Sequence, residues 1–175
     1  MYKICICLLS LFLFCDCMDR ENEEYFDAAH KYISELPEYK SKNIFIVDYL
    51  NNFGISSDVR DSLINQKHKL FKDLKGKNQL DLACAVWDIQ KYVHNNLRKK
   101  MPLFNKYNKC DKYDYIASFS PFYEGILCFE ILKTEKNRPF GFNAHRRSNE
   151  STHYTFIFDS NKKIKEVFKC TFTYN

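Results

Sequence analysis

The sequence predicts an α+β fold in which N-terminal helices pack on one face of a C-terminal antiparallel sheet of about four strands. Up to about residue 100, apolar residues recur every three or four positions, which is the period of one helix face. Beyond Tyr113, apolar and polar residues alternate, which is typical of half-buried strands. The period changes once, and no repeat or low-complexity linker interrupts the chain. We therefore expect a single domain over residues 18–175.

The chain begins with an apolar run, Ile4 to Phe14, that is interrupted only by Ser10. A membrane-spanning helix needs about 20 apolar residues, so this run is too short to span a membrane. It matches the apolar region of a secretory signal, which is about 7–15 residues long. Cys15 and Cys17 follow as the small residues of a cleavage site. We therefore predict that residues 1–17 are a signal segment and that the mature chain is exported.

The same N-terminal segment resembles bacterial lipoprotein signals. Directly after the two cysteines comes an acidic stretch, which resembles the export tract that follows the lipidated cysteine in some surface-exposed bacterial lipoproteins. The resemblance implies a lipid on Cys17 or Cys15, although Asp16 and Phe14 stand where the pattern has a small residue. The expected location is thus the cell envelope, through a lipid anchor, or the medium after soluble release. The anchor is slightly favoured, and no other contact with a membrane is expected.

Composition narrows the class of protein. Removing residues 1–17 from the 175 leaves 158 residues, enough to bury a single hydrophobic core without stabilising disulfides or metal ions. The net charge is +5 and the pI is about 8.7, below the value of about 9 that is typical of nucleic-acid domains, so no nucleic-acid partner is expected. The mature cysteines allow three pairings, among which the sequence does not choose. The four cysteines of the predicted mature chain are Cys84, Cys110, Cys128 and Cys170.

The histidines and cysteines give no sign of a metal centre. His30, His68 and His94 are expected on helix surfaces, and no two of them have metal-ligand spacing. The sequence also lacks a glycine-rich phosphate loop, a serine elbow and a cysteine–histidine pairing. We therefore expect no metal and no cofactor.

The helical part of the chain contains one ambiguous stretch. The first helix should end before Pro37, which cannot continue the apolar pattern. Residues 43–53 fit either a strand at Ile44–Val47 or a helix ending at Gly54, and the pattern favours the helix. Apart from this ambiguous stretch, three helices are predicted. The first is Asn22–Leu36, the second starts after Ser56 or Ser57 and ends before Gly76, and the third is Leu80–Lys99, at the centre of the core.

Four strands are expected after Tyr113, and the last two form a hairpin through the turn residues "DSNKK". Alternation places Cys128 on the outward face with Glu130, and Cys170 on the inward face with Phe172. Side chains on opposite faces cannot form a disulfide, so we predict no Cys128–Cys170 bond. The expected strands cover about residues 113–120, 123–131, 153–158 and 163–173.

The segment between the second and third strands, Asn137–Ser151, concentrates the reactive side chains. It is long for a loop inside a compact domain, and such loops often carry function. Arginines bind carboxylates and phosphates through two parallel hydrogen bonds, and arginine and aromatic side chains are favoured in protein interfaces. We therefore predict a binding site for another protein in this segment. Its candidate residues are Arg138, Phe140, His145, Arg146 and Arg147.

A second interpretation makes the chain an enzyme. The strand "THYTFIF" resembles the terminal strand of barnase-type microbial ribonucleases, which also place helices before an antiparallel sheet; Thr152 stands where that family has an acid. RNA cleavage needs a base for the 2′-hydroxyl, a cation for the phosphate and an acid for the leaving oxygen. The resemblance implies His153 as the acid, with Glu130 (or Glu124) and Arg138 (or Arg146) as base and cation.

The sequence therefore predicts an exported, lipid-anchored or secreted binding or inhibitory module. The alternative is a secreted ribonuclease-like enzyme that uses Glu130, Arg138 and His153.

Overall fold

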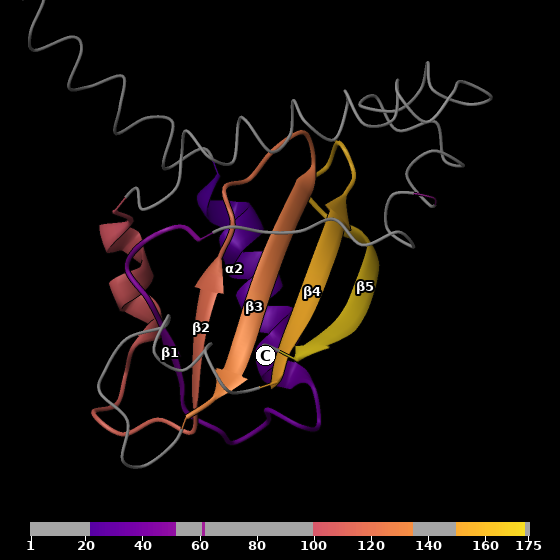
Figure 1. Ribbon diagram of the computed structural model, residues 1–175. Coiled ribbons are helices and arrows are strands. Elements are labelled where there is room, and N and C mark those ends of the chain that lie inside the picture. The colour runs from indigo at the N-terminus through magenta and orange to yellow at the C-terminus, as the bar shows by residue number, and fades with distance from the viewer. Residues whose placement is uncertain (1–21, 52–60, 62–99, 135–149, 174–175) are drawn as a thin grey trace, which may run out of the picture.

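The computed structural model describes residues 22–51, 61, 100–134 and 150–173. Among the elements that the described residues form in full, an α-helix, α2, and a short 3₁₀ helix, η1, accompany a five-stranded sheet in which the strands lie in chain order, β1 to β5 (Figure 1). The elements are α2 (Glu23–Glu35), β1 (Ile44–Ile46), η1 (Pro102–Tyr107), β2 (Tyr115–Phe119), β3 (Ile126–Lys133), β4 (Glu150–Phe158) and β5 (Ile164–Thr173). The α+β prediction is confirmed at this level.

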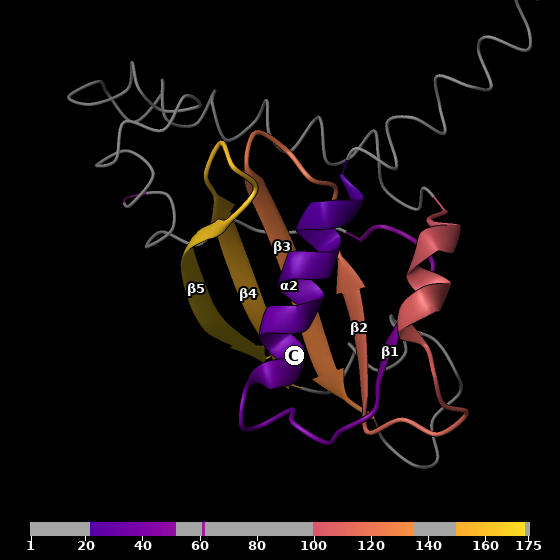
Figure 2. The same ribbon diagram turned by 180° about the vertical axis from the view of Figure 1, so that it is seen from behind.

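Helix α2 lies within the predicted range Asn22–Leu36 and crosses one face of the sheet, as the view from behind shows (Figure 2). Phe26, Ala29 and Ile33 are buried because their three- and four-residue spacing places them on one side of the helix. The helix ends at Glu35, Leu36 is already extended, and Pro37 follows. The first turn carries Glu23 and Glu24, whose charges suit a helix N-terminus.

The sheet differs from the prediction in strand number and direction. It has five strands rather than four, and it is mixed, because β1 runs parallel to β2 while the other pairs are antiparallel. The additional strand comes from residues 43–53, where the favoured helix is wrong and Ile44–Ile46 is β1. Distant backbone partners decide this stretch, since Ile44 pairs with Tyr115 and the Asn51 N–H donates to the Phe119 carbonyl.

The edge of β1 is closed by a side chain. The backbone N–H of Ile46 donates to Asn108 Oδ1 at 2.7 Å, and Asn108 Nδ2 donates to the Ile46 carbonyl at 2.8 Å. The Asn108 amide thus copies the hydrogen bonds of a further strand and satisfies groups that an edge strand leaves open. Asn108 directly follows η1, which lies beside β1 in both views (Figures 1 and 2).

Two tight turns set the register of the antiparallel strands. Glu124 and Gly125 both have positive φ, 53° and 83°, as a two-residue hairpin turn of type I′ requires. The Tyr123–Ile126 hydrogen bonds close this turn between β2 and β3. In the predicted "DSNKK" turn, the Asp159 carboxylate accepts hydrogen bonds from the backbone N–H groups of Asn161 and Lys163.

The face of the sheet under α2 holds the main core. Its aromatic side chains contact one another edge to face, an arrangement that aromatic quadrupoles favour. Phe26 of α2 lies 5.0 Å from the ring of Phe104 and 5.1 Å from that of Phe119, and Phe119 lies 4.8 Å from Phe129. The prediction that Tyr154, Phe156 and Phe158 share one face is confirmed, since all three belong to this core. The buried side chains of α2 and η1 thus pack in one core with those of the sheet.

The predicted face of Cys128 is confirmed, since Cys128 and Glu130 lie on the face opposite to α2, but the predicted inward face of Cys170 is wrong. Cys128 pairs with Thr155 on β4, which in turn pairs with Phe168 of β5. His153 pairs with Cys170, so Cys128 and Cys170 share the face opposite to α2. A register shift between Ile157 and Phe158 brings Ile164 to the helix-covered face and moves Phe168, Cys170 and Phe172 to the other. The two thiols are free in the structure, but the opposite-face argument against their bond does not hold.

Several predictions lie outside the described residues and stay predictions. They concern the signal segment 1–17, the helices after Ser56 and over Leu80–Lys99, and Cys84. Within the described part of the chain, α2 and the other helical residues form no apolar helix long enough to cross a membrane.

Candidate functional site

The predicted binding residues Arg138, Phe140, His145, Arg146 and Arg147 fall within 135–149, outside the described residues. The candidate lipidation sites Cys15 and Cys17 are also outside them. The structure does describe both ends of the 135–149 segment. Leu132 of β3 pairs with Ser151 of β4, so the segment leaves and rejoins two adjacent central strands.

Of the three residues in the enzyme hypothesis, the structure brings two together. Glu130 on β3 and His153 on β4 are direct cross-strand partners, and Glu130 Oε1 lies 3.2 Å from His153 Nε2. The third, Arg138, is outside the described residues. Ser151 Oγ also lies 2.9 Å from His153 Nε2. The side chains of His153 and Glu130 are 8% and 4% exposed, so this cluster is buried.

The cluster belongs to a polar row that crosses the face opposite to α2. The register aligns one polar residue from each of four adjacent strands: Ser118, Glu130, His153 and Cys170. The Phe172 ring lies 4.5 Å from the His153 ring on the same face. Strand alternation predicted that Glu130 would face away from the helix, but it did not align these four residues because register depends on the turns.

The contacts of His153 restrict what this cluster can catalyse. In a serine–histidine–acid triad, the hydroxyl contacts one ring nitrogen and the carboxylate contacts the other. Here Ser151 and Glu130 contact the same nitrogen, Nε2. A nitrogen that donates its proton to Glu130 cannot accept the hydroxyl proton of Ser151. The observed geometry therefore links two strands and does not activate Ser151 as a nucleophile.

Cys128, beside the polar row, is an inert thiol in this environment. Its side chain is buried, and its Sγ lies 3.3 Å from the Thr155 hydroxyl. Burial raises the pKa of the Cys128 thiol far above its usual range, and the Thr155 contact opposes this only in part. Because the thiolate is the reactive form, we assign Cys128 to packing.

A groove of about 280 Å³ lies between α2, β1 and the segment that follows η1; we call it the His30 groove. The His30 ring stacks on the Tyr107 ring with centroids 4.3 Å apart. Phe45 and Tyr113, which also line the groove, form a second ring pair at 5.1 Å. The remaining lining residues are Ser34, Lys42, Asn43, Ile44, Asn108, Lys109 and Cys110.

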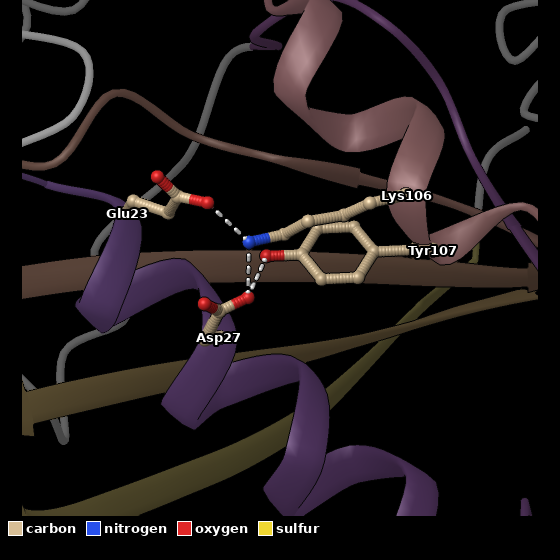
Figure 3. A network of polar contacts seen from close by, with 4 residues as sticks. All are labelled: Glu23, Asp27, Lys106 and Tyr107. Atoms are coloured by element: carbon tan, nitrogen blue, oxygen red, sulfur yellow. Dashed lines mark hydrogen bonds and ion pairs between the residues drawn. The ribbon is translucent and has the colours of Figure 1, made fainter.

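A network of charged groups fixes η1 on α2 and so positions one wall of this groove (Figure 3). Lys106 Nζ lies 2.6 Å from both Glu23 Oε1 and Asp27 Oδ1, and the Tyr107 hydroxyl donates to Asp27 Oδ1 at 2.7 Å. Burial opposes ionisation of Asp27, but the hydrogen bonds from Lys106 and Tyr107 outweigh it and lower the Asp27 pKa below 3.8. The network thus holds the Tyr107 ring where His30 stacks on it.

The Asp27 interaction predicts a pH-dependent loss of stability. Because the folded-state pKa of Asp27 is lower than its unfolded value, the stabilisation is present above about pH 4 and is lost as the pH falls through the folded pKa. With Asp27 partly exposed, we expect Asp27→Asn to cost only about 0.5–1 kcal/mol at pH 7. Urea denaturation should show this difference at pH 7 and a much smaller one at pH 3. Glu35→Gln, an exposed neutralisation on the same helix, is the control, and an equal loss there would contradict the assignment.

The expectation that His30 is a surface residue is wrong in part, because His30 is about half-buried between α2 and Tyr107. Burial lowers the pKa of His30 below 6.5; Asp27 opposes this, and the charges of Lys109 and Lys106 add to it. One signal in the sequence was usable, since Asp27 and His30 are three residues apart and therefore adjacent on a helix. It could not indicate that residues 107–113 would pack against them.

The part of the chain that the structure describes contains no group of three or more histidine, cysteine or carboxylate side chains that could hold a metal ion. Comparison of the chain with models of protein families, with curated proteins and with solved structures found no match.

Proposed function

We propose that this chain is an exported binding or inhibitory module whose partner is another protein. The recognition surface is the end of the sheet where β3 and β4 meet the 135–149 segment. The supporting observation is that Leu132 and Ser151, at the two ends of this segment, are paired and almost fully buried. Binding residues are often found on segments that connect the elements of a well-packed scaffold.

The described residues at this end of the sheet also suit a protein partner. A shallow pocket there is lined by charges of both signs and by aromatic rings, and aromatic and charged groups anchor many interfaces. Lys169 Nζ lies 2.8 Å from Glu38 Oε1, and the Tyr154 hydroxyl donates to the same oxygen. The lining residues are Glu38, Tyr39, Tyr115, Ile131, Lys133, Glu150, Thr152 and Lys169. Arg138, Arg146 and Arg147 would add cations from the adjoining segment.

Capture of the partner tests this proposal. We expect the combined change Arg138→Ala, Arg146→Ala and Arg147→Ala to abolish capture from extracts of the native host, since truncating an arginine in a buried interfacial pair costs about 2–5 kcal/mol. The melting temperature should stay nearly unchanged, because surface substitutions usually alter stability by about 0.5 kcal/mol or less.

A matched variant controls for charge. Lys31→Ala, Lys100→Ala and Lys163→Ala remove three positive charges from exposed positions outside the recognition surface, and capture should persist. Unchanged capture by the arginine variant would refute the recognition surface. Unfolding of that variant would show instead that the arginines support the fold.

Export is tested separately by mass spectrometry of the protein from its native host. Residues 1–17 should be absent from the folded protein. A lipid on Cys15 or Cys17 would establish the envelope anchor, and a chain that starts at Met18 would establish soluble release. An intact Met1 would refute the export proposal.

The ribonuclease-like alternative is favoured by one observation, the 3.2 Å contact between Glu130 and His153 on adjacent strands. In the observed geometry the Glu130 carboxylate contacts the His153 ring. This contact would have to break before Glu130 could accept a proton from a 2′-hydroxyl. Incubation of the mature protein with RNA tests this alternative. Cleavage that disappears in a folded His153→Ala variant would place it above the binding module.

A further inference from the structure

The His30 groove combines two features that point to one kind of ligand. Two pairs of rings belong to its lining, His30 with Tyr107 and Phe45 with Tyr113. Planar ligands pack on such rings through offset or edge contacts. The charge of the lining has one sign, since the lining residues include Lys42, Lys109 and His30 and no carboxylate.

Both lysines have their ammonium groups available. Lys42 and Lys109 are exposed, and among the described residues neither forms an ion pair. Lys106, by contrast, is held by Glu23 and Asp27. Asn43 and Asn108 are both fixed through hydrogen bonds, the first from its backbone N–H to Asp114 and the second to Ile46. The groove therefore combines an aromatic lining with two lysines that form no ion pair among the described residues.

We infer that the His30 groove is a second binding site, separate from the surface at the end of β3 and β4, and that it takes a small anion attached to a single planar ring. The ring packs on the aromatic lining of the groove, and the anionic group, a carboxylate or a phosphate, contacts Lys42 and Lys109. A volume of about 280 Å³ is near the lower end for small-molecule sites, which suits one ring rather than a larger group.

The protonation of His30 provides a signature of such a ligand. In the free protein its pKa is lowered, so His30 is mostly neutral near pH 7. A bound anion favours the charged imidazole, so binding takes up a proton and tightens as the pH falls below about 6.5. The charged groups that face His30 are Asp27 on α2 and Lys106 and Lys109 on the η1 side. Asp27 stays ionised throughout this range, because its own pKa lies below 3.8.

Titration calorimetry with four probes tests the inference. Benzoate and phenyl phosphate carry both the ring and the anion, whereas inorganic phosphate and benzyl alcohol carry one each. We expect at least one of the first two to bind about tenfold or more tightly than either of the others; which one binds better distinguishes a carboxylate from a phosphate ligand. If neither binds, or if inorganic phosphate binds as tightly, the inference is refuted.

Substitutions in the His30 groove test whether the probe binds there. Lys42→Ala with Lys109→Ala should weaken benzoate binding about tenfold, whereas Lys31→Ala with Lys163→Ala, which removes equal charge outside the groove, should leave it unchanged. Benzoate stays ionised between pH 5.5 and 7.5, so the pH dependence over that range reports His30, and His30→Gln should abolish it. Equal binding by both lysine pairs would place the anion elsewhere. A pH dependence that persists in His30→Gln would contradict the assigned contact.

Discussion

Phe26→Ala should be among the most destabilising single substitutions in the described part of the chain, with an expected loss of about 3–5 kcal/mol in the free energy of unfolding. Phe26 is 1% exposed and contacts Phe104 of η1 and Phe119 of β2 edge to face. Its removal leaves a cavity where α2, η1 and the sheet meet. Since domains of this size are stable by about 5–15 kcal/mol, the variant should be partly unfolded on mild heating. Urea denaturation followed by circular dichroism measures the loss.

Two further substitutions separate the cavity from the loss of an aromatic ring. Phe26→Leu keeps most of the volume and should cost less than about 1.5 kcal/mol. Phe172→Ala removes the same ring from a site that is 39% exposed and should change stability by about 1 kcal/mol or less. Similar losses for Phe26→Ala and Phe172→Ala would contradict the placement of α2 over the main core.

Glu130→Ala should cost about 3–5 kcal/mol, because it removes one partner of a buried charged or hydrogen-bonded pair. Glu130 Oε1 lies 3.2 Å from His153 Nε2, and neither side chain is more than 8% exposed. Glu130→Gln keeps the shape and one acceptor oxygen, so its loss should be about 1–2 kcal/mol. Urea denaturation at pH 7 measures both.

Replacing both partners together is the matched control for this pair. Apolar groups of similar volume often substitute for a buried ion pair without loss, so Glu130→Leu with His153→Leu should be more stable than Glu130→Ala. If Glu130→Ala instead keeps nearly full stability, the pair is not part of the structural framework. The ribonuclease-like alternative would then gain support, because residues retained for chemistry often contribute little to stability.

Local patterns predicted those parts of the fold in which one period dominates. The spacing of Phe26, Ala29 and Ile33 places α2 correctly, and alternation places the last two strands. The prediction from local patterns is wrong at residues 44–46, where the apolar run fits both the helical and the strand period. Pairing with β2 decides that stretch, since Ile44 pairs with Tyr115, 71 positions further along the chain, and no local window contains this information.

The faces of β5 show a different limit. Alternation along the strand is correct from Phe168 to Phe172, but the register shift near Phe158 reverses the relation of that stripe to Ile164. A bulge of this kind changes the face of every later residue, so Cys170 joins His153 rather than the core under α2. To predict that Glu130 lies beside His153, the register of β3 and β4 must be known. To predict the His30 groove, the packing of α2, β1 and the segment after η1 must be known. Residue types in the sequence could suggest candidates but could not place them together.

The parallel pairing of β1 with β2 has a consequence for the order of folding. The antiparallel pairs β2–β3 and β4–β5 are joined by short turns, so each can form after a small loss of chain entropy. The hydrogen bond from Asn43 to Asp114 instead closes a separation of 71 residues, and such contacts form slowly. The β1 edge, together with the Asn108 contacts that complete it, should therefore be among the last parts to form. In native-state hydrogen exchange, the Ile46 and Val47 amides should open at a lower free energy than those of β3, as expected for a segment that docks onto a preformed sheet.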